Sequence, residues 1–367
     1  MLRYRIVKAI DPYLLAAVLS ISVFGLVVIN SASGMLNSSS AHVAKQSAAL
    51  ALGGVGLLGL ALLDYRTVAR ASRYLYIANL ALLVLVLVLG REAKGAQRWI
   101  PIGPFNLQPS EFAKLLLIVT LANHLSRAGE SIMTVAGLAR SALHVGIPAL
   151  LIFRQPDLGT SLVVVTIWFG MTYMAGAKWW HLLLCVLALA GAACVLWHSD
   201  ALKPYQKQRL VSFLNPDADP QGSGYHIRQS RIAIGSGQLF GKGLYRGTQK
   251  QLRFVPESHT DFIFTVVGEE MGFVGCVGLL GLYLLLIWRA LRIATVCEDL
   301  LGQLIAGGVA VLFLFHVVVN VGMTLGMMPV TGVPLLLFSY GPSSVLSNLL
   351  AVGVLQSIHI RRLKLMF

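Results

Sequence analysis

Long apolar segments alternate with short polar segments along the whole chain. Ten of them are close to the ~18–20 apolar residues that a helix needs to cross a bilayer. Gly, Ala and Ser are frequent in these segments and suit close helix packing in lipid. The pattern predicts an all-α polytopic membrane protein with about ten transmembrane helices, at residues 12–30, 43–63, 73–90, 111–126, 136–153, 158–175, 179–197, 262–288, 302–327 and 343–360.

The composition agrees with this pattern. The 367 residues are 56% hydrophobic and 12% charged, whereas soluble domains carry about a quarter charged residues. No polar segment is long enough to form a soluble domain, so residues 1–367 are predicted to form a single membrane domain. The four cysteines show neither metal-ligand spacing nor a disulfide pattern.

The distribution of Lys and Arg predicts the orientation. Basic residues gather in the short connections on one side of the ten segments, and such loops stay in the cytoplasm. With ten crossings, both termini lie on that side and residues 198–261 form a large basic extracytoplasmic loop. The net charge of +14 therefore lies beside membrane spans, which argues against nucleic acid. Anionic headgroups of membrane lipids and a phosphorylated substrate both remain open as partners of the outer loop.

Residues 254–264 carry the strongest candidate chemistry. Glu257, His259 and Asp261 stand at the start of the apolar run 262–288, which also contains Glu269 and Glu270. A carboxylate at the mouth of a membrane is costly to desolvate, so it has either a task or a tight partner. Glu257 and Asp261 repel each other unless a proton or cation lies between them.

Three other polar motifs have a structural and a functional interpretation. Glu111 and Lys114 lie three residues apart on one helix face, either as an ion pair or in an active-site cavity. Ser110 is expected to cap their helix, and Asp157 to cap the helix that follows it. The glycine-rich residues 234–247 do not match a Walker A loop and predict a tight surface turn or a backbone nest for an anion.

Several motifs in the same order resemble the SEDS family (shape, elongation, division and sporulation), most closely its rod-shape members. They are residues 94–100 (KGAQRWI), 105–114, 155–161 (QPDLGTS), 205–209 (YQKQR), 224–230, 233–237, 254–264, 332–334 and 339–341. The chain departs from the family pattern at Leu336 and Pro342, where the family usually has proline and glycine. Proline is tolerated in the first turn of a helix, so Pro342 need not disturb the fold.

The resemblance implies a peptidoglycan glycosyltransferase with ten spans that polymerises lipid II at the outer face of the bacterial cytoplasmic (inner) membrane. It also implies a class B penicillin-binding protein as transpeptidase partner, and makes Asp261 the essential carboxylate. We predict that Asp261 is the base of an inverting displacement that releases undecaprenyl diphosphate. The short termini and the segments at residues 205–209 (YQKQR) and 259–264 (HTDFIF) favour a role in elongation over division. A lipid II flippase and a non-catalytic scaffold of the cell-wall synthesis machinery are the alternatives.

The remaining site residues are predicted from charge and position. The resemblance places Arg98 and Lys114 in the family's active-site region. Cations there would offset the charge of the leaving diphosphate. A divalent cation, Mg or Mn, is predicted near Glu257 and Asp261. The full set of predicted substrate-binding residues is Arg98, Lys114, Glu111, Lys94, Arg209, Arg246, His259 and Ser343.

Overall fold

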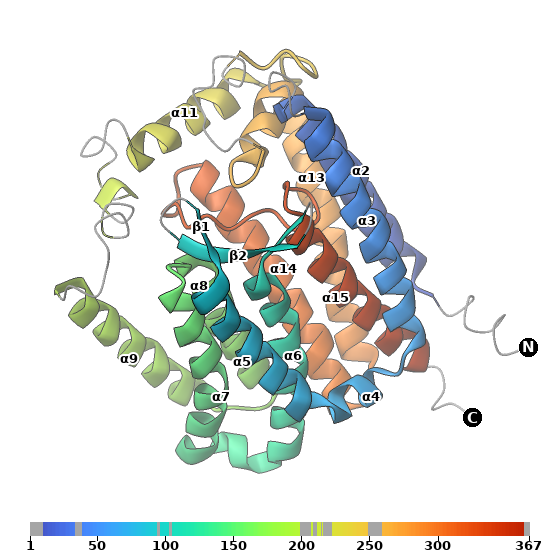
Figure 1. The fold of residues 1–367 in the computed structure, drawn as a ribbon, viewed down its shortest axis with the longest axis vertical. Coiled ribbons are helices and arrows are strands. Elements are labelled where there is room, and N and C mark those ends of the chain that lie inside the picture. Colours follow the sequence, from blue (N-terminus) through green and yellow to red (C-terminus); the bar gives the residue numbers. More distant parts are fainter. Residues whose placement is uncertain are drawn as a thin grey trace, which may run out of the picture.

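The structure is a computed structural model that describes residues 10–33, 39–93, 96–102, 105–198, 207, 211–213, 215, 222–248 and 259–362. Each of the ten predicted apolar ranges coincides with one long helix in a bundle (Figure 1), which confirms an all-α polytopic membrane fold. These helices are α2 (Pro12–Ser33), α3 (Ser39–Leu62), α5 (Ser72–Leu89), α6 (Pro109–Ala128), α7 (Val135–Arg154), α8 (Leu158–Met174), α9 (Trp179–His198), α13 (Ile263–Val296), α14 (Leu300–Thr324) and α15 (Pro342–Arg361).

Seven of the helices in the described part of the chain are long and apolar enough to cross a membrane: α2, α3, α5, α7, α13, α14 and α15. Helices α8 and α9 are also apolar, but their apolar stretches, Leu158–Met174 and Trp179–Val195, are shorter. Helix α6 carries Glu111 in its first turn and the buried Lys114. Ten crossings therefore stay a prediction.

Three short elements connect these helices. Helix α4 (Tyr65–Arg70), the 3₁₀ helix η1 (Gly129–Met133) and helix α11 (Ser223–Ser236) precede α5, α7 and α13. A small antiparallel sheet, which the hydrophobic pattern did not predict, joins α5 to α6. Its strands are β1 (Arg91–Ala93), β2 (Ala96–Ile102) and β3 (Phe105–Leu107), in the order β1-β2-β3.

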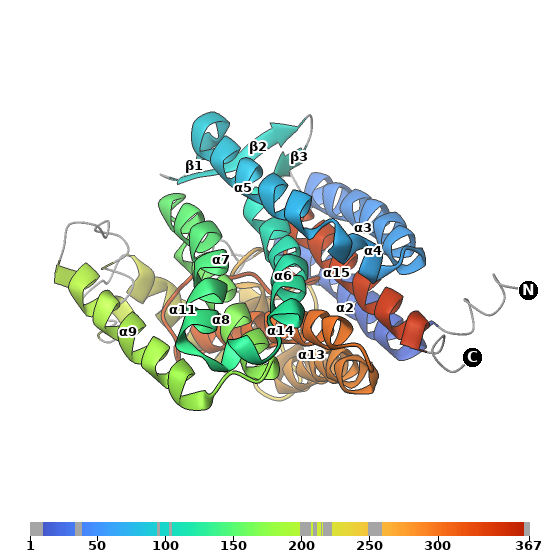
Figure 2. The ribbon, with the colours of Figure 1, turned by 90° about the horizontal axis from the view of Figure 1, so that it is seen from below.

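Small residues set the close packing at the centre of the bundle. Helix α15 lies against α3, where a Cβ on Gly353 would lie 2.7 Å from the backbone oxygen of Leu57. Gly307 and Gly308 of α14 likewise receive the side chains of Met174 and Met171 from α8. Helices α14 and α15 are therefore buried among their neighbours, whereas α9 lies at the margin of the bundle (Figure 2). The abundance of small residues in the apolar segments has this packing role.

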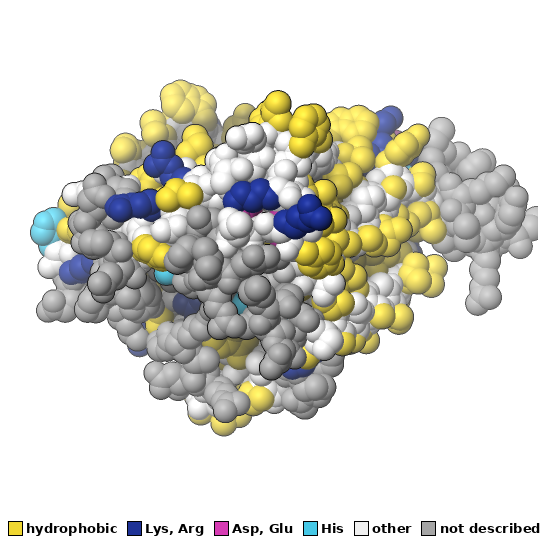
Figure 3. All heavy atoms as spheres, turned by 90° about the horizontal axis from the view of Figure 1, so that it is seen from above, with side chains coloured by type: hydrophobic (Ala, Val, Ile, Leu, Met, Phe, Trp, Pro, Cys, Tyr) yellow, Lys and Arg dark blue, Asp and Glu magenta, His cyan; other side chains and the backbone are white. Residues whose placement is uncertain are grey.

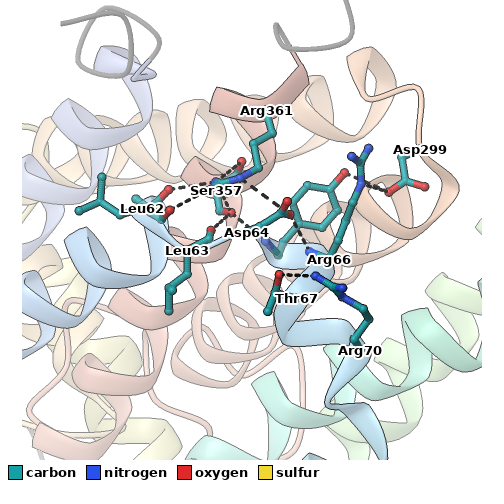
Figure 4. A network of polar contacts seen from close by, with 11 residues as sticks. Leu62, Leu63, Asp64, Arg66, Thr67, Arg70, Asp299, Ser357 and Arg361 are labelled. Carbon is teal, nitrogen blue, oxygen red and sulfur yellow. Dashed lines mark hydrogen bonds and ion pairs between the residues drawn. The ribbon is translucent and has the colours of Figure 1, made fainter. Parts of the chain in front are cut away.

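Polar contacts fasten the connection between α3 and α5 to the end of α15 (Figure 4). The Arg361 guanidinium donates to the carbonyl oxygens of Ala61 and Leu62, and Ser357 Oγ donates to Leu63 O. These are terminal carbonyls of α3 and its exit, which have no partner within the helix. The neighbouring Tyr65 hydroxyl donates to Asp299 Oδ2, and burial raises the pKa of Tyr65, so the phenol keeps its proton.

Helix α13 contains a break at Gly272, whose φ of 64° and ψ of −159° lie outside the helical region. Residues 237–247, which we call the glycine loop, lie beside this break. The amides of Lys242 and Gly243 donate to Glu269 O and Glu270 O at 3.0 and 2.9 Å. These two loop amides are occupied by the carbonyls of the broken helix, so the glycine loop is a surface turn with a packing role, and the anion nest is not supported at them.

The two carboxylates inside α13 have the tight partners that their membrane position demands. Lys242 Nζ and Thr248 Oγ1 donate to Glu269 Oε1 at 2.8 and 3.1 Å. Ser31 Oγ, from the end of α2, lies 2.6 Å from Glu270 Oε2. Buried charges that are hydrogen-bonded in this way avoid the cost of an isolated ion in lipid.

The predicted helix caps have mixed outcomes. Asp157 Oδ1 accepts from Thr160 N at 3.2 Å, which confirms the cap of α8. The prediction for Ser110 was wrong, because Pro109 begins α6 and moves the N-cap to Gln108. Pro342 lies in the first turn of α15, where its missing amide costs no helical hydrogen bond.

Candidate active site

Asp261 lies in the turn that leads into α13, where it is half-buried. Its backbone is held by Asn320 of α14, whose side chain is completely buried. The Asn320 amide nitrogen donates to Asp261 O at 2.9 Å and to Val333 O at 2.8 Å. One side chain therefore joins the Asp261 turn to segment 331–334, which is part of the connection between α14 and α15.

Lys114 belongs to a buried chain of polar groups. Its Nζ donates to Glu111 Oε1 at 2.9 Å and lies 3.3 Å from His316 Nε2. His316 Nδ1 is 2.9 Å from Pro334 O. A carbonyl oxygen only accepts, so Nδ1 carries the ring proton and Nε2 of the neutral ring accepts from Lys114. The predicted pairing of Glu111 with Lys114 is present, and His316 extends it to segment 331–334.

Helix α14 brings Lys114 and Asp261 to the same region. His316 and Asn320 are four residues apart, so they lie on one face of α14, one turn from each other. His316 contacts Lys114 and Pro334, while Asn320 contacts Asp261 and Val333. Segment 331–334 is therefore a common support for both predicted residues.

Arg98, in strand β2, is bound to the turn between α7 and α8. Its guanidinium donates to Gln155 O at 3.1 Å and to Pro156 O, and lies 3.8 Å from Asp157 Oδ1. The start of α8, directly after this turn, abuts segment 331–334, because a Cβ on Gly159 would lie 2.7 Å from Thr331 O. Arg98 thus positions this turn near the site.

Three rings gather beside Asp261. The His259 ring stacks on His42 of α3, with centroids 5.2 Å apart and planes inclined by 15°. Tyr340 lies 4.6 Å from the His42 ring and 5.8 Å from the His259 ring, and its amide donates to His259 O at 3.0 Å. Burial raises the pKa of Tyr340, so its hydroxyl remains a donor at neutral pH. Gln46 of α3 accepts from Gly341 N at 3.2 Å and fixes the residue that precedes α15.

The other predicted substrate-binding residues have separate contacts or lie outside the described residues. Ser343 Oγ donates to Asn106 O and accepts from Gln108 N at 2.9 and 3.1 Å, so it links α15 to the start of α6. Arg246 is exposed in the glycine loop. Lys94, Arg209 and Glu257 lie outside the residues that the structure describes.

The predicted divalent cation stays a prediction. Among the described residues, no three His, Cys, Asp or Glu side chains gather where they could hold a metal ion. Glu257, which is predicted to hold the ion together with Asp261, lies outside those residues.

Sequence reasoning did not identify Asn320, His316 or His42 as site residues. A signal was present for two of them, because His316 and Asn320 are polar residues within the apolar run of α14. Polar side chains inside membrane segments usually pair or mark a functional path. Gln46 is likewise a polar residue within the predicted span 43–63, and Tyr340 lies in the motif at residues 339–341.

The family described as cell cycle protein, with FtsW, RodA and SpoVE, matches residues 12–364. The chain belongs to this family. Peptidoglycan glycosyltransferase MrdB of Escherichia coli strain K12 is 40% identical, over 96% of this chain and 94% of that protein. Peptidoglycan glycosyltransferase RodA of Treponema pallidum is 36% identical, over 99% and 100%. The family predicted from the motifs is confirmed.

Solved structures of similar proteins share the fold. A chain from a structure described as "Structural coordination of polymerization and crosslinking by a peptidoglycan synthase complex" has a TM-score of 0.83 and 38% identity, and covers 96% of this chain and 98% of its own. The rod shape determining protein RodA of Thermus thermophilus has a TM-score of 0.73 and 36% identity, over 96% and 97%. Both are similar to this chain over nearly its full length.

Proposed function

We propose that this chain, a peptidoglycan glycosyltransferase by its family and relatives, polymerises lipid II with Asp261 as the general base. The observation that carries the assignment is the placement of Asp261. It is a carboxylate at the threshold of a membrane helix, with its backbone fixed by a buried amide at 2.9 Å. A fixed base close to a reacting hydroxyl supplies both orientation and proton transfer.

In the proposed step, a sugar hydroxyl of the acceptor attacks the anomeric carbon of the donor's muramyl residue. The new carbon–oxygen bond forms as the bond from that carbon to the diphosphate oxygen breaks. Asp261 takes the hydroxyl proton, and undecaprenyl diphosphate leaves with the bonding electron pair. A single displacement of this kind inverts an α-linked donor to a β-linked strand.

Positive charge near the site supports departure of the diphosphate. Lys114 is 1% exposed, so in this conformation it acts on the diphosphate through its field and not by direct contact. Arg98 orients the turn at residues 155–157 in the same region. Lys94, Arg209 and Arg246 are proposed to supply further charge from the outer loops, and a Mg or Mn ion at Glu257 and Asp261 remains part of the proposal.

The cellular setting is proposed from the charge pattern and the relatives. Basic short loops support cytoplasmic termini and an active site at the outer face of the cytoplasmic (inner) membrane. Relatives named RodA support a role in elongation. The similar chain from a synthase complex that coordinates polymerization and crosslinking supports a class B penicillin-binding protein as partner.

The test is polymerisation of labelled lipid II by the purified protein in vesicles, with and without a partner transpeptidase. We expect glycan strands to lengthen with time. Movement of lipid II between leaflets without lengthening would instead indicate a flippase. If lipid II is neither moved nor lengthened, with or without the partner, the result indicates a scaffold and overturns the proposal.

A further inference from the structure

The glycine loop presents an apolar tip to its surroundings. Leu239 is 60% exposed and Phe240 is 80% exposed. Two adjacent large apolar side chains in this state would be costly in water. Figure 3, which looks onto this end of the molecule, shows apolar and basic side chains next to one another at the surface.

The position of the tip is fixed by hydrogen bonds to α13. The amides of Phe273 and Val274 donate to Gln238 O and Leu239 O at 2.8 and 3.1 Å. These amides follow the break at Gly272, so they have lost their normal helical partners. The loop satisfies them, and the tip lies at the level of residues 273 and 274 as a consequence.

Helices α2 and α13 together mark the thickness of the membrane. At one end, Arg289 of α13 binds Asp11, just before α2, at 2.6 Å. At the other end, Ser31 of α2 binds Glu270 of α13 at 2.6 Å. About twenty residues separate the two contacts along each helix, a rise of about 30 Å, which equals the hydrocarbon thickness of a bilayer. The Ser31–Glu270 contact therefore lies at one boundary of the hydrocarbon.

The tip lies on the hydrocarbon side of that boundary. Residues 273 and 274 are three to four residues further along α13 than Glu270, a distance of about 5 Å. Their own side chains are 61% and 55% exposed, as expected on a face that contacts lipid. Interfacial segments bury their apolar face about 5–10 Å below the headgroups, so the depth of the tip fits this range.

The groups around the tip have the chemistry of a membrane interface. The Tyr245 hydroxyl accepts from Asn30 Nδ2 at 3.0 Å, next to the Ser31 contact. Arg246 is exposed beside it, while Lys242 is paired with Glu269 at 2.8 Å. Aromatic rings and cations are enriched at the level of the headgroups.

We infer that the glycine loop is a membrane anchor, with Leu239 and Phe240 inserted into the leaflet on the Asp261 side and Arg246 among its phosphate headgroups. The partner is thus the phospholipid surface. A membrane is favoured over a protein occupant because the tip lies at hydrocarbon depth on a face whose neighbours on α13 are also exposed. The inference depends on the membrane position of α2 and α13, and holds whether or not Asp261 is the base.

The test measures the depth of the tip in the full chain, reconstituted alone in phospholipid vesicles. Cysteine is placed at Phe240 in a background without Cys185, Cys194, Cys276 and Cys297 and labelled with a nitroxide. Oxygen, which partitions into lipid, and a water-soluble nickel chelate then compete as relaxation agents. Labels at Val277, exposed on α13, and at Glu298, exposed between α13 and α14, serve as the lipid and water references.

We expect oxygen to relax the Phe240 label as it relaxes the Val277 label. We expect the chelate to relax the Phe240 label at least several-fold less than it relaxes the Glu298 label. Relaxation by the chelate to the extent seen at Glu298 would overturn the anchor. Protection from both agents would indicate a protein contact and would overturn it as well. If the Phe240→Cys chain does not fold, Leu239→Cys carries the same expectation.

Discussion

At the residue scale, single side chains hold together segments that are remote in the sequence. Asn320 is the clearest case, because one amide nitrogen binds Asp261 O and Val333 O. His316, one turn away, does the same for Lys114 and Pro334. The position of the proposed base therefore depends on two polar residues of α14 that would be expensive in a membrane without these bonds.

Asn320→Asp should impair turnover, because a carboxylate of the same size cannot donate to the two carbonyls. A displaced base costs about 10²-fold for a shift of about 1 Å, so we expect kcat to fall by about that factor with little change in KM. Steady-state polymerisation kinetics give both values. The matched control is Thr324→Val, one turn further along α14, which removes only a local hydrogen bond to Val321 O. Equal losses in both variants would contradict a positioning role for Asn320.

Lys114→Ala should lower both stability and turnover. It leaves Glu111 buried without its cation, and breaking a buried pair costs about 3–5 kcal/mol. The double variant Glu111→Gln with Lys114→Met removes both charges and should recover most of the stability. If the field of Lys114 aids the diphosphate, turnover of the double variant stays low. Recovery of turnover together with thermal stability would show that the pair is only structural.

At the element scale, the break in α13 is maintained by the glycine loop, which lies before it in the sequence. Gly272 adopts a conformation that is nearly restricted to glycine. A Cβ there would lie 2.4 Å from Gly241 N. The break, the glycine loop and the contacts of Glu269 and Glu270 thus form one structural unit.

Gly272→Ala should destabilise the protein by about 1–3 kcal/mol from backbone strain alone. Gly278→Ala is the control on the same helix, because its Cβ would meet no atom within 4 Å and alanine favours helix. Thermal unfolding in detergent should show a lower midpoint for Gly272→Ala and an unchanged or higher one for Gly278→Ala. Equal midpoints for the two variants would argue against the strained break.

The helices could be predicted from the sequence because each is a continuous apolar run, and their bounds agree with the structure within a few residues for most of them. The prediction ended α13 at residue 288, where Arg289 ends the apolar run, whereas the helix continues to Val296 with Arg289 bound to Asp11. The candidate site was predicted less completely. Asp261 and Lys114 were found from their charge, but the bonds of Asn320 join residues 59 and 13 positions apart, and no local pattern encodes them.

The whole molecule has its proposed chemistry at one end of the bundle. Helix α11 and the turn that contains Asp261 lie at this end, since Ile227 of α11 packs with Phe262. The contacts of Asp64, Arg361 and Asp299 lie at the opposite end (Figures 1 and 4). The basic short loops assign that opposite end to the cytoplasm.

A cysteine at Ser223, the first residue of α11, should therefore react with an impermeant thiol reagent in intact spheroplasts. A cysteine at Thr67 of α4, which is exposed at the opposite end, should react only after the membrane is broken. Labelling is measured in the cysteine-free background. The reverse pattern would contradict cytoplasmic termini.

The most direct measurement of the central claim is lipid II polymerisation by purified Asp261→Asn protein. Asparagine keeps the size of the side chain but cannot accept the proton, so turnover should fall by about 10²–10⁴-fold. Asp299→Asn, which alters a carboxylate bonded to Tyr65 and Arg66 at the opposite end, should keep turnover near that of the wild type. Polymerisation at the wild-type rate by a well-folded Asp261→Asn protein would contradict the assignment of Asp261 as the base.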